Sequence, residues 1–417
     1  MSHSSAFPTR SLLADQLPQR RPILATMPGP DPLWNTYVHD HLPENAGTFK
    51  DYMALLKLAK GREMLILNGS VGRKQKYRDL IFAILLKWIF SRPPRVLMQD
   101  ATWEPRSEAL ESEFPFLKRI VPKLARLAIS LLDGPHVRYA VLSTSEVKTF
   151  PAVWGVDPDR VVFQPFPNTL HQYRGMNTRD DGYLFSGGNS VRDYELLEAA
   201  LEGTNIPTRV ASKWQPSRGL ENLEVNSTSH EDFMSLLAHS RAVVVPLRQS
   251  VRSAGQQSYL NAMGLGKAVI VTEAPGVRDY IIDGVTGIIV QPTVEHLRAA
   301  IVHVMDPANA EFYRQMGQRA REDVFKRFTE EHFRHGLLLH AGVISQDQFE
   351  KGARRGRDAS GYDHRGGPGL SAGAGGSQSG VFMRAGTGPG SRNEKTGHMG
   401  PFFLTTWRKR RHSHHAC

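Results

Sequence analysis

The sequence predicts an α/β protein with two Rossmann-like domains that face each other across a cleft. Short apolar runs of the kind that form buried strands alternate with longer helix-like runs, which is typical of parallel sheets covered by helices. The alternation occurs twice, and the polar, turn-rich stretch 168–182 separates the two sets. The chain has 417 residues and is 40% hydrophobic, so each half can bury a core of its own.

The expected elements follow the apolar runs in order. In the first half, strands are expected at 21–27, 63–69, 95–100, 139–145 and 160–166, with helices near 49–60, 77–90 and 108–132. In the second half, strands are expected at 182–188, 208–212, 242–247, 268–272 and 287–291. The amphipathic run 312–339 then follows, and it is long enough to pack across the domain junction.

These elements define the expected boundaries. We expect a flexible N-terminus at 1–20, a first domain at 21–170, a linker at 171–181, a second domain at 182–310, closing helices at 311–345 and a disordered, basic, Gly-rich tail at 346–417.

The charge is concentrated in the tail. Between Lys351 and Cys417 there are 12 Lys and Arg against 3 Asp and Glu, so +9 of the net charge of +11 lies there. The same segment holds 15 of the 37 glycines and cannot bury enough apolar surface to offset the entropy of ordering. The nearly neutral body is therefore not expected to bind nucleic acid, and solvated disorder explains the tail better than an RNA or lipid contact.

Cysteine usage and hydropathy restrict the class further. Cys417 is the only cysteine, which excludes a disulfide framework within the chain and a cysteine-ligated metal site. The N-terminal residues lack the apolar segment of a secretory signal. The longest apolar run, 80–90, reaches roughly 16 Å as a helix against a hydrocarbon core of ~30 Å. We expect a cytoplasmic protein, and a position at the cytosolic face of a membrane is the alternative that stays open.

One glycine-bearing loop, 248–258, follows a predicted strand and opens a helix. A helix start leaves four N–H groups unpaired and carries about half a positive charge, so a phosphate group is a natural guest. Gly255 lets the backbone come close to a ligand, and Gln256, Gln257 and Ser258 add polar groups. Taken by itself, an ordinary strand–loop–helix crossover explains this loop better.

A second loop of the same kind changes that balance. Gly187 and Gly188 end a predicted strand, and Arg192 stands beside the helix that follows. Arginine is the side chain best suited to fork onto phosphate oxygens, although a single arginine more often pairs with a surface carboxylate. Two such loops in one domain favour a nucleotide-diphosphate cleft. The glycine spacing is neither that of an ATPase P-loop nor that of a dinucleotide dehydrogenase.

At this point the sequence resembles a known family. YLNAMGLGKAVIVTEAPGVRDYIIDGVTGIIVQP (259–292) is similar to the donor-binding half of the group 1 (family 4) glycosyltransferases of GT-B fold. FSGGNSVRDYELLEAA (185–200) resembles the family's first donor-domain loop, and YAVLSTSEVKTFPAVWGVDPDRVVFQPFP (139–167) resembles the end of its acceptor domain. MGQRAREDVFKRFTEEHF (316–333) resembles its closing helix.

The resemblance implies transfer of a sugar from a nucleotide-diphosphate donor to a hydroxyl acceptor, usually with retention at the anomeric carbon. It makes the first domain the acceptor side and the second the nucleotide-sugar side. Arg192 would be the diphosphate clamp, and no metal or other cofactor is expected. The implied donor-binding residues are Gly187, Gly188, Arg192, Ser253, Gly255, Gln256, Gln257, Ser258 and Asn261.

The sequence also departs from the family pattern. The family usually carries two glutamates eight residues apart, one for the donor sugar and one for the ribose; Ser253 and Asn261 occupy these positions here. Asn261 can still bind ribose hydroxyls, and a glutamine at 256 or 257 could replace the lost sugar contact. The Arg that usually follows the first glycine is Gly188.

The acceptor side is less clearly marked. Asp100 and Glu104 follow the third predicted strand and could polarise an acceptor hydroxyl, but a helix cap and a surface acid explain them slightly better. The run 114–132 mixes basic and apolar residues at helical spacing, which would suit an anionic membrane carrying a lipid-linked acceptor. A helix covering the first sheet, with Lys and Arg on its solvated side, is the favoured interpretation.

Three hypotheses stay open at the level of sequence. The leading one is a glycosyltransferase; its acceptor would be a glycan, a lipid-linked molecule or a small molecule. The second is a catalytically silent relative that binds a nucleotide sugar or glycan as a sensor or partner, because both glutamates are replaced. The third is an enzyme of the same fold with another reaction, such as a nucleotide-sugar epimerase.

Overall fold

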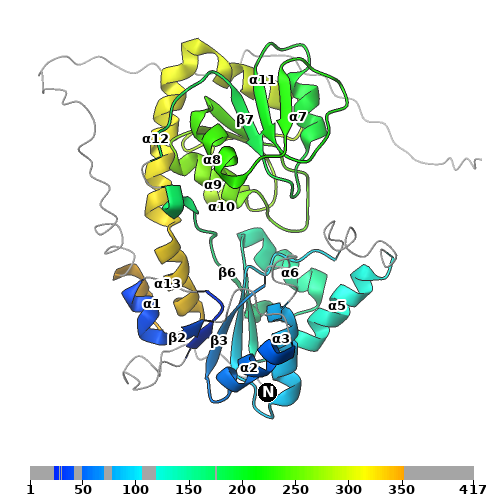
Figure 1. Cartoon of the computed structure of the whole chain (residues 1–417), viewed down its shortest axis with the longest axis vertical. Helices are drawn as coiled ribbons and strands as arrows, with labels where there is room; N and C mark the ends of the chain where they lie inside the picture. The colour runs from blue at the N-terminus through cyan, green and yellow to red at the C-terminus, as the bar shows by residue number, and fades with distance from the viewer. Residues whose placement is uncertain are drawn as a thin grey trace, which may run out of the picture. The chain divides into compact units, whose positions relative to one another are not determined.

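The computed structural model describes residues 23–27, 29, 31–41, 49–69, 78–105, 119–173 and 176–351, all of which belong to one compact unit. The expected flexible N-terminus (1–20) and the tail from residue 352 lie outside the described residues. Two lobes make up the described unit. The first lobe contains strands β1–β6, and the second contains β7–β12 (Figure 1).

The described elements have the following bounds. The first lobe contains β1 (Ile23–Ala25), α1 (Pro32–Tyr37), β2 (Val38–His41), α2 (Phe49–Ala59), β3 (Met64–Asn68), α3 (Arg78–Ile89), β4 (Arg95–Gln99), α5 (Val121–Leu132), β5 (Val137–Val141), α6 (Thr144–Trp154) and β6 (Val161–Phe163). The second contains β7 (Leu184–Gly187), α7 (Tyr194–Leu201), β8 (Thr208–Ala211), β9 (Leu223–Asn226), α8 (His230–His239), β10 (Ala242–Val245), α9 (Gln256–Gly264), β11 (Ala268–Thr272), α10 (Val277–Tyr280), β12 (Ile288–Val290) and α11 (Val294–Met305). Helices α12 (Ala310–Arg327) and α13 (Glu330–His340) close the fold.

Both sheets have six parallel strands. The order is β2-β1-β3-β4-β5-β6 in the first lobe and β12-β11-β10-β7-β8-β9 in the second. In the second sheet the strand order reverses direction between β7 and β10. In open parallel sheets, ligands bind at the carboxyl ends of the strands beside such a reversal, and the two predicted phosphate loops follow these two strands.

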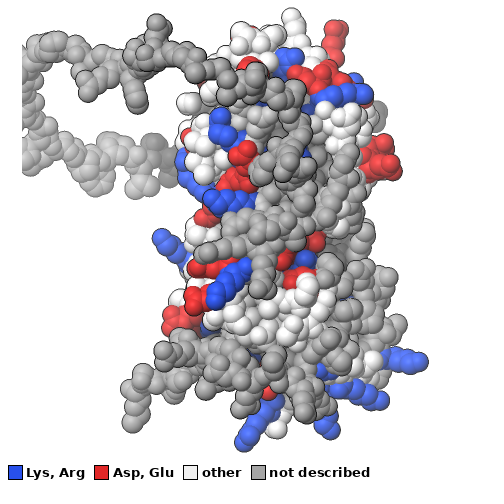
Figure 2. Space-filling model, turned by 90° about the vertical axis from the view of Figure 1, so that its left-hand side faces the viewer, with Lys and Arg blue, Asp and Glu red and all other residues white. Residues whose placement is uncertain are grey.

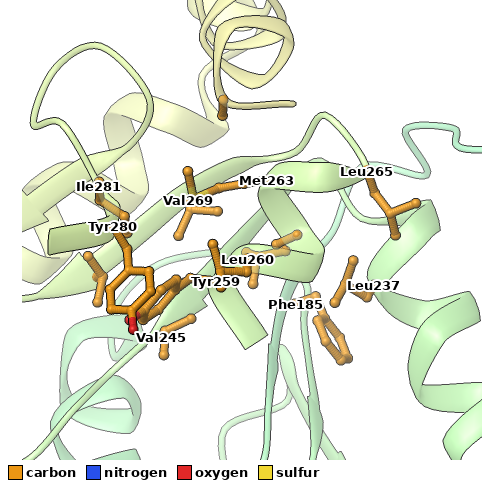
Figure 3. Close-up of a cluster of buried hydrophobic side chains, with 14 of the residues drawn as sticks. Phe185, Leu237, Val245, Tyr259, Leu260, Met263, Leu265, Val269, Tyr280 and Ile281 are labelled. Atoms are coloured by element: carbon orange, nitrogen blue, oxygen red, sulfur yellow. The ribbon is translucent and has the colours of Figure 1, made fainter. Parts of the chain in front are cut away.

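Each sheet is buried on both faces, which explains its continuous apolar runs. Along β10, Val243 and Val245 face one core cluster, while Ala242 and Val244 face the opposite one. Successive side chains of a strand point to opposite faces, so a strand covered on both sides must be apolar throughout. Figure 3 shows the cluster that contains Val245, with α9 packed over the strands.

The α/β prediction is confirmed, with local corrections. Two strands, β2 and β9, were not predicted; β9 reads Leu-Glu-Val-Asn and exposes every second residue at the sheet edge. The strand predicted over 139–145 ends at Val141. Ser143 instead caps α6, because its hydroxyl accepts a hydrogen bond from the N–H of Glu146.

The closing run crosses from one lobe to the other as two helices. α12 packs on the second lobe through Met316, Ala320 and Val324, whereas α13 packs on the first through Leu337 and Leu338 (Figure 1). The break between the helices lies at Phe328 and Thr329, and the Thr329 hydroxyl caps α13. The run 312–339, which the sequence shows to be long enough to pack across the domain junction, thus contacts both lobes.

Helix α5 covers the first sheet, as the favoured interpretation of 114–132 required. Ile129 and Leu132 are buried, but Leu124 and Leu127 are exposed next to Lys123 and Arg126, so the outer side is not purely basic. Residues 106–118 lie outside the described part. Among described residues, no helix is both long and apolar enough to cross a bilayer. On the face in Figure 2, acidic and basic side chains are interspersed, with basic ones prevailing over the lower end.

The chain end of the described unit contributes to the core. Val343 and Ile344 are buried in the first-lobe cluster beside α13, and residues 346–351 are helical. The prediction that disorder begins at residue 346 is therefore wrong for 346–351, because Phe349 packs against the same cluster.

A pair of truncations separates this core segment from the predicted tail. A chain that ends after Ala341 loses Val343 and Ile344 and should lose about 3 kcal/mol or more of unfolding free energy in urea. A chain that ends after Lys351 keeps both residues and should match the full chain. A clear loss of stability in the chain that ends after Lys351 would contradict the prediction that the tail is disordered.

Candidate functional site

A cavity of about 360 Å³ opens at the carboxyl ends of β7 and β10 and reaches the first lobe. It is lined by Asp100, Thr102, Leu142, Phe166, Gly188, Asn189, Ser190, Arg192, His230, Phe233, Arg252, Ser253, Ala254, Gly255, Gln256, Gln257, Ser258 and Asn261. Of the sequence-predicted site residues, only Gly187 and Glu104 are not among its walls. The structure thus brings the two predicted phosphate loops to one cavity.

The first loop is held in a strained, left-handed conformation. Gly188 has φ +103°, and Val191 has φ +55°, which is rare for a β-branched residue. Two hydrogen bonds fix the loop to the segment after β10: the Asp193 N–H donates to the Pro246 carbonyl and the Arg248 N–H donates to the Val191 carbonyl. Because these hydrogen bonds hold the loop in its strained conformation, the side chain of the next residue, Arg192, lies in the cavity wall.

Arg192 is a buried cation surrounded by neutral oxygens. Its side chain donates to the carbonyls of Gly187 (3.2 Å) and Ser190 (2.7 Å) and to the hydroxyl of Ser258 (2.8 Å). Burial lowers the pKa of Arg192 from its usual value. Within the described part of the chain, no carboxylate forms an ion pair with it. The cavity therefore presents a positive charge that lacks an anion, which is costly in a protein interior.

The start of α9 adds to this positive potential. Gly255 is the N-cap with φ +89°, and no side chain caps the helix. Its first N–H groups thus lie at the cavity wall, next to the Ser258 hydroxyl that Arg192 holds. A helix start of this kind stabilises an anion. The sequence predicts that Gly255 and Ser258 contribute to a phosphate site at this helix start, and their role in binding stays a prediction.

Arg252 is a wall residue that the sequence analysis missed. Its guanidinium donates to the Ser190 hydroxyl (2.7 Å) and forms an ion pair with Glu104 (3.4 Å). The Glu104 carboxylate also accepts a hydrogen bond from the Ser250 hydroxyl. Glu104 is thus used to join the first lobe to the loop after β10. Two arginines, Arg248 and Arg252, occur in that loop, and no sequence pattern distinguishes Arg252 from Arg248.

Asp100 lies at the first-lobe side of the cavity. It follows β4 with φ +55°, and Thr102 donates a hydrogen bond to its carboxylate (3.2 Å). Burial raises the pKa of Asp100 to about 7, with the charge of Glu146 adding to the rise and Arg252 and Thr102 opposing it. A carboxyl group with that pKa exchanges protons readily at neutral pH.

Two groups of hydrogen bonds hold the polar side chains at and beside the two positions where the family has glutamates. The Asn261 amide is committed to the linker, because its oxygen accepts from the Thr169 N–H (2.9 Å) and its nitrogen donates to the Thr169 hydroxyl (2.8 Å). Gln257 also donates to that hydroxyl (3.3 Å). Ser253 is buried and accepts a hydrogen bond from the Gln256 amide nitrogen (2.7 Å).

A second residue that the sequence analysis missed is Glu146, in the first turn of α6. It is 2% exposed, and its carboxylate accepts hydrogen bonds from the hydroxyls of Ser253 (2.6 Å) and Ser143 (2.8 Å). Burial raises the pKa of Glu146, and these hydrogen bonds oppose the rise. The segment STSE at 143–146 looked like the end of a strand, so its glutamate carried no signal.

The candidate metal ligands among the described residues lie away from the cavity. The one cluster of His and acidic groups with suitable spacing there is Asp31, Glu331 and His335. Asp31 contacts His335 at 2.8 Å and lies 3.7 Å from the Arg334 guanidinium, whose charge opposes a cation. None of these residues lines the cavity. The cluster is an ion-pair group between α1 and α13.

Comparisons with known proteins agree with this geometry. Residues 200–306 match the family model described as "Glycosyl transferases group 1". No curated protein matches the sequence at a significant level.

Solved structures with similar folds are distant in sequence. HepE from Anabaena in complex with UDP is 12% identical, with a TM-score of 0.52 over 77% of this chain and 99% of that one. HepE with UDP and glucose gives 11% and 0.51 over 78% and 100%. Sucrose-phosphate synthase from Thermosynechococcus elongatus is 17% identical, with a TM-score of 0.49 over 73% and 77%. The HepE matches show the same GT-B fold, which confirms the fold prediction.

Gly276 allows the two lobes to meet at the site, and this can be tested. It has φ +83°, and a Cβ there would lie 2.6 Å from the Ser143 Cβ and 2.7 Å from the Ser253 Cβ. Gly276→Ala should cost more stability than the roughly 1–2 kcal/mol of left-handed strain alone, and it should weaken ligand binding in the cavity.

The matched control is Gly284→Ala. Gly284 has φ +73° but open space around its Cα, so only the strain applies. Chemical denaturation and nucleoside-diphosphate titration of both variants give the comparison. Equal losses in the two variants would show that the lobes do not meet this closely in solution.

Proposed function

We propose that this chain is a group 1 glycosyl transferase that moves a sugar from a nucleotide-diphosphate donor to a hydroxyl acceptor. Residues 200–306 match the model of that family, which supports the class of reaction. The donor is supported by the cavity, and the similar fold of HepE occurs in complexes with UDP and with UDP and glucose. The hydroxyl acceptor, retention at the anomeric carbon and the absence of a metal requirement are part of the proposal.

The observation that carries the proposal is the buried, unneutralised Arg192. A diphosphate bound there would receive a charge-assisted hydrogen bond from the guanidinium and the N–H groups at the start of α9. Arg252 brings a second cation to the same wall. Together these groups supply the positive charge that a leaving diphosphate needs, which is why we expect no metal ion to be required.

The chemistry needs no nucleophilic side chain. The bond between the anomeric carbon and the diphosphate oxygen breaks, its electron pair leaves with the diphosphate, and the acceptor oxygen forms the new bond. The proton of the acceptor hydroxyl goes either to Asp100 or to the departing phosphate oxygen. Fixed donors aimed at the leaving group stabilise the charge that develops in the transition state.

The silent-binder hypothesis keeps one supporting observation. Ser253 and Asn261 are not carboxylates, and the Asn261 amide is occupied by Thr169. A nucleotide-sugar panel separates the two functions: a chain that binds one donor tightly but neither transfers nor hydrolyses its sugar is the silent binder. An epimeric nucleotide sugar among the products would identify the third hypothesis.

Substitution of Arg192 tests the donor site. Arg192→Ala should weaken nucleoside-diphosphate binding by about 1.5–3 kcal/mol, the scale of a hydrogen bond to a charged group, measured by calorimetry. Arg218→Ala is the control, because Arg218 is exposed and pairs with Glu202 in the same lobe. An unchanged affinity in the Arg192 variant would mean that the diphosphate binds elsewhere.

The pKa of Asp100 gives a pH test. If its carboxylate takes the acceptor proton, turnover should rise with pH around 7, and Asp100→Asn should abolish this rise. The same pKa is raised from 3.8, so the folded chain keeps the proton to higher pH than the unfolded chain. This contribution to stability is complete below about pH 4 and is lost as pH rises through about 7.

The stability measurement is therefore independent of turnover. Asp100→Asn should make the protein relatively more stable than the parent above pH 7, because no buried carboxylate forms. If turnover of the parent does not change between pH 6 and 8, the proton goes to the departing diphosphate and Asp100 only orients the acceptor.

A further inference from the structure

Glu146 and Ser253 form a contact between the lobes at the position where the family pattern places a carboxylate. Ser253 occupies that position on the second lobe, and its hydroxyl is 2.6 Å from the carboxylate of Glu146 on the first. The Ser253 hydroxyl is also 2.7 Å from the amide nitrogen of Gln256, which lines the cavity. Three side chains thus form a hydrogen-bonded series from the interior of one lobe to the cavity wall of the other.

The direction of these hydrogen bonds follows from the number of protons. A serine hydroxyl has one proton to donate, and an ionised carboxylate only accepts. Since Ser253 donates to Glu146, it must accept from Gln256, and this fixes the amide nitrogen of Gln256 toward Ser253. The Gln256 amide oxygen, which has no partner among the described residues, is then free to accept a hydrogen bond in the cavity.

We propose that Glu146 is a positioning residue that orients the Gln256 amide through Ser253, so that the Gln256 oxygen accepts a hydrogen bond from a hydroxyl of the donor sugar. This deepens the proposed function and rests on it. The carboxylate missing at position 253 is replaced from the other lobe, and the sugar contact passes to Gln256. Since Glu146 belongs to the first lobe, the contact is complete only when the lobes meet.

The alternative is that Glu146 is a buried acid with a structural role only. Its own helix offers a reason, since the N–H of Glu146 is bonded to Ser143 at the N-cap, and the Ser143 hydroxyl returns a bond to the carboxylate. Such a role would affect stability and all ligands equally. The positioning role instead concerns the sugar alone, because the diphosphate is held by Arg192 and the start of α9.

The test compares a nucleotide sugar with its nucleoside diphosphate. Affinities for UDP and UDP-glucose, and for GDP and GDP-mannose, give the contribution of the sugar to binding in each pair. In Glu146→Gln, the new amide can donate a hydrogen bond to the Ser253 hydroxyl. The Ser253 proton can then turn toward Gln256, and the Gln256 amide is no longer held in one orientation. We expect about a tenfold loss of nucleotide-sugar affinity, with nucleoside-diphosphate affinity unchanged.

Combined variants show whether the three residues act as one unit. Ser253→Ala and Gln256→Ala should give the same selective loss, and Glu146→Gln should add nothing in the Gln256→Ala background. Gln257→Ala separates the two glutamines, because Gln257 bonds to Thr169 and not to Ser253: a loss of the sugar contribution in Gln257→Ala but not in Gln256→Ala would contradict the proposal. If Glu146→Gln fails to fold, Ser253→Ala and Gln256→Ala alone decide the outcome.

A matched control removes a buried glutamate elsewhere. Glu198 is 1% exposed in α7 and accepts bonds from Ser217 and Arg218. Glu198→Gln should alter stability without altering the sugar contribution. An equal loss for both ligands in Glu146→Gln, or additive losses in the double variant, would overturn the proposal. A parent that binds none of the four probes would overturn the proposed function itself, and the positioning role with it.

Discussion

The arrangement of the second lobe depends on one unfavourable element, the burial of the Arg192 charge without a carboxylate partner among the residues that the structure describes. An isolated buried ion is expensive, and removal from water must be offset by hydrogen bonds and by the surrounding structure. Carbonyls of the loop after β7 and the Ser258 hydroxyl provide those bonds. The loop itself is held by the segment after β10. The reversal of strand order, the left-handed Val191 and the start of α9 therefore all help to fix the position of the Arg192 side chain.

Much of this could be predicted because it depends on local patterns. A strand buried on both faces needs a continuous apolar run, and a parallel sheet brings its carboxyl ends to one edge, so the two glycine loops had to meet if the strands paired as expected. The positions of Gly188, Arg192 and Gly255 at the cavity follow from that rule. The missed strand β9 alternates between half-buried and exposed residues and lies at an edge, so its apolar signal is weak.

The contacts between lobes could not be predicted in the same way. Glu104 and Glu146 are separated from their partners Arg252 and Ser253 by more than a hundred positions in sequence, and neither stands in a motif. Beside the contact of Glu146 with Ser253, Gly276 comes close to Ser143 and Ser253, and this approach depends on the packing of two independent sheets. A sequence pattern defines the sites within each lobe but not the register between lobes.

The electrostatics of the cavity give a reason why the carboxylate is that of Glu146, behind the Ser253 hydroxyl, and not that of a glutamate at position 253. Arg192 and Arg252 bring two cations to the walls, one of them partly neutralised by Glu104, and Asp100 loses its proton only near pH 7. A glutamate at position 253 would add a full negative charge beside a bound diphosphate. Glu146 instead lies behind the Ser253 hydroxyl, and the groups that line the cavity there are a neutral hydroxyl and a neutral amide. In the proposed function, these hydrogen bonds would transmit the polarising effect of the Glu146 carboxylate, while its repulsion of a bound diphosphate would fall with distance.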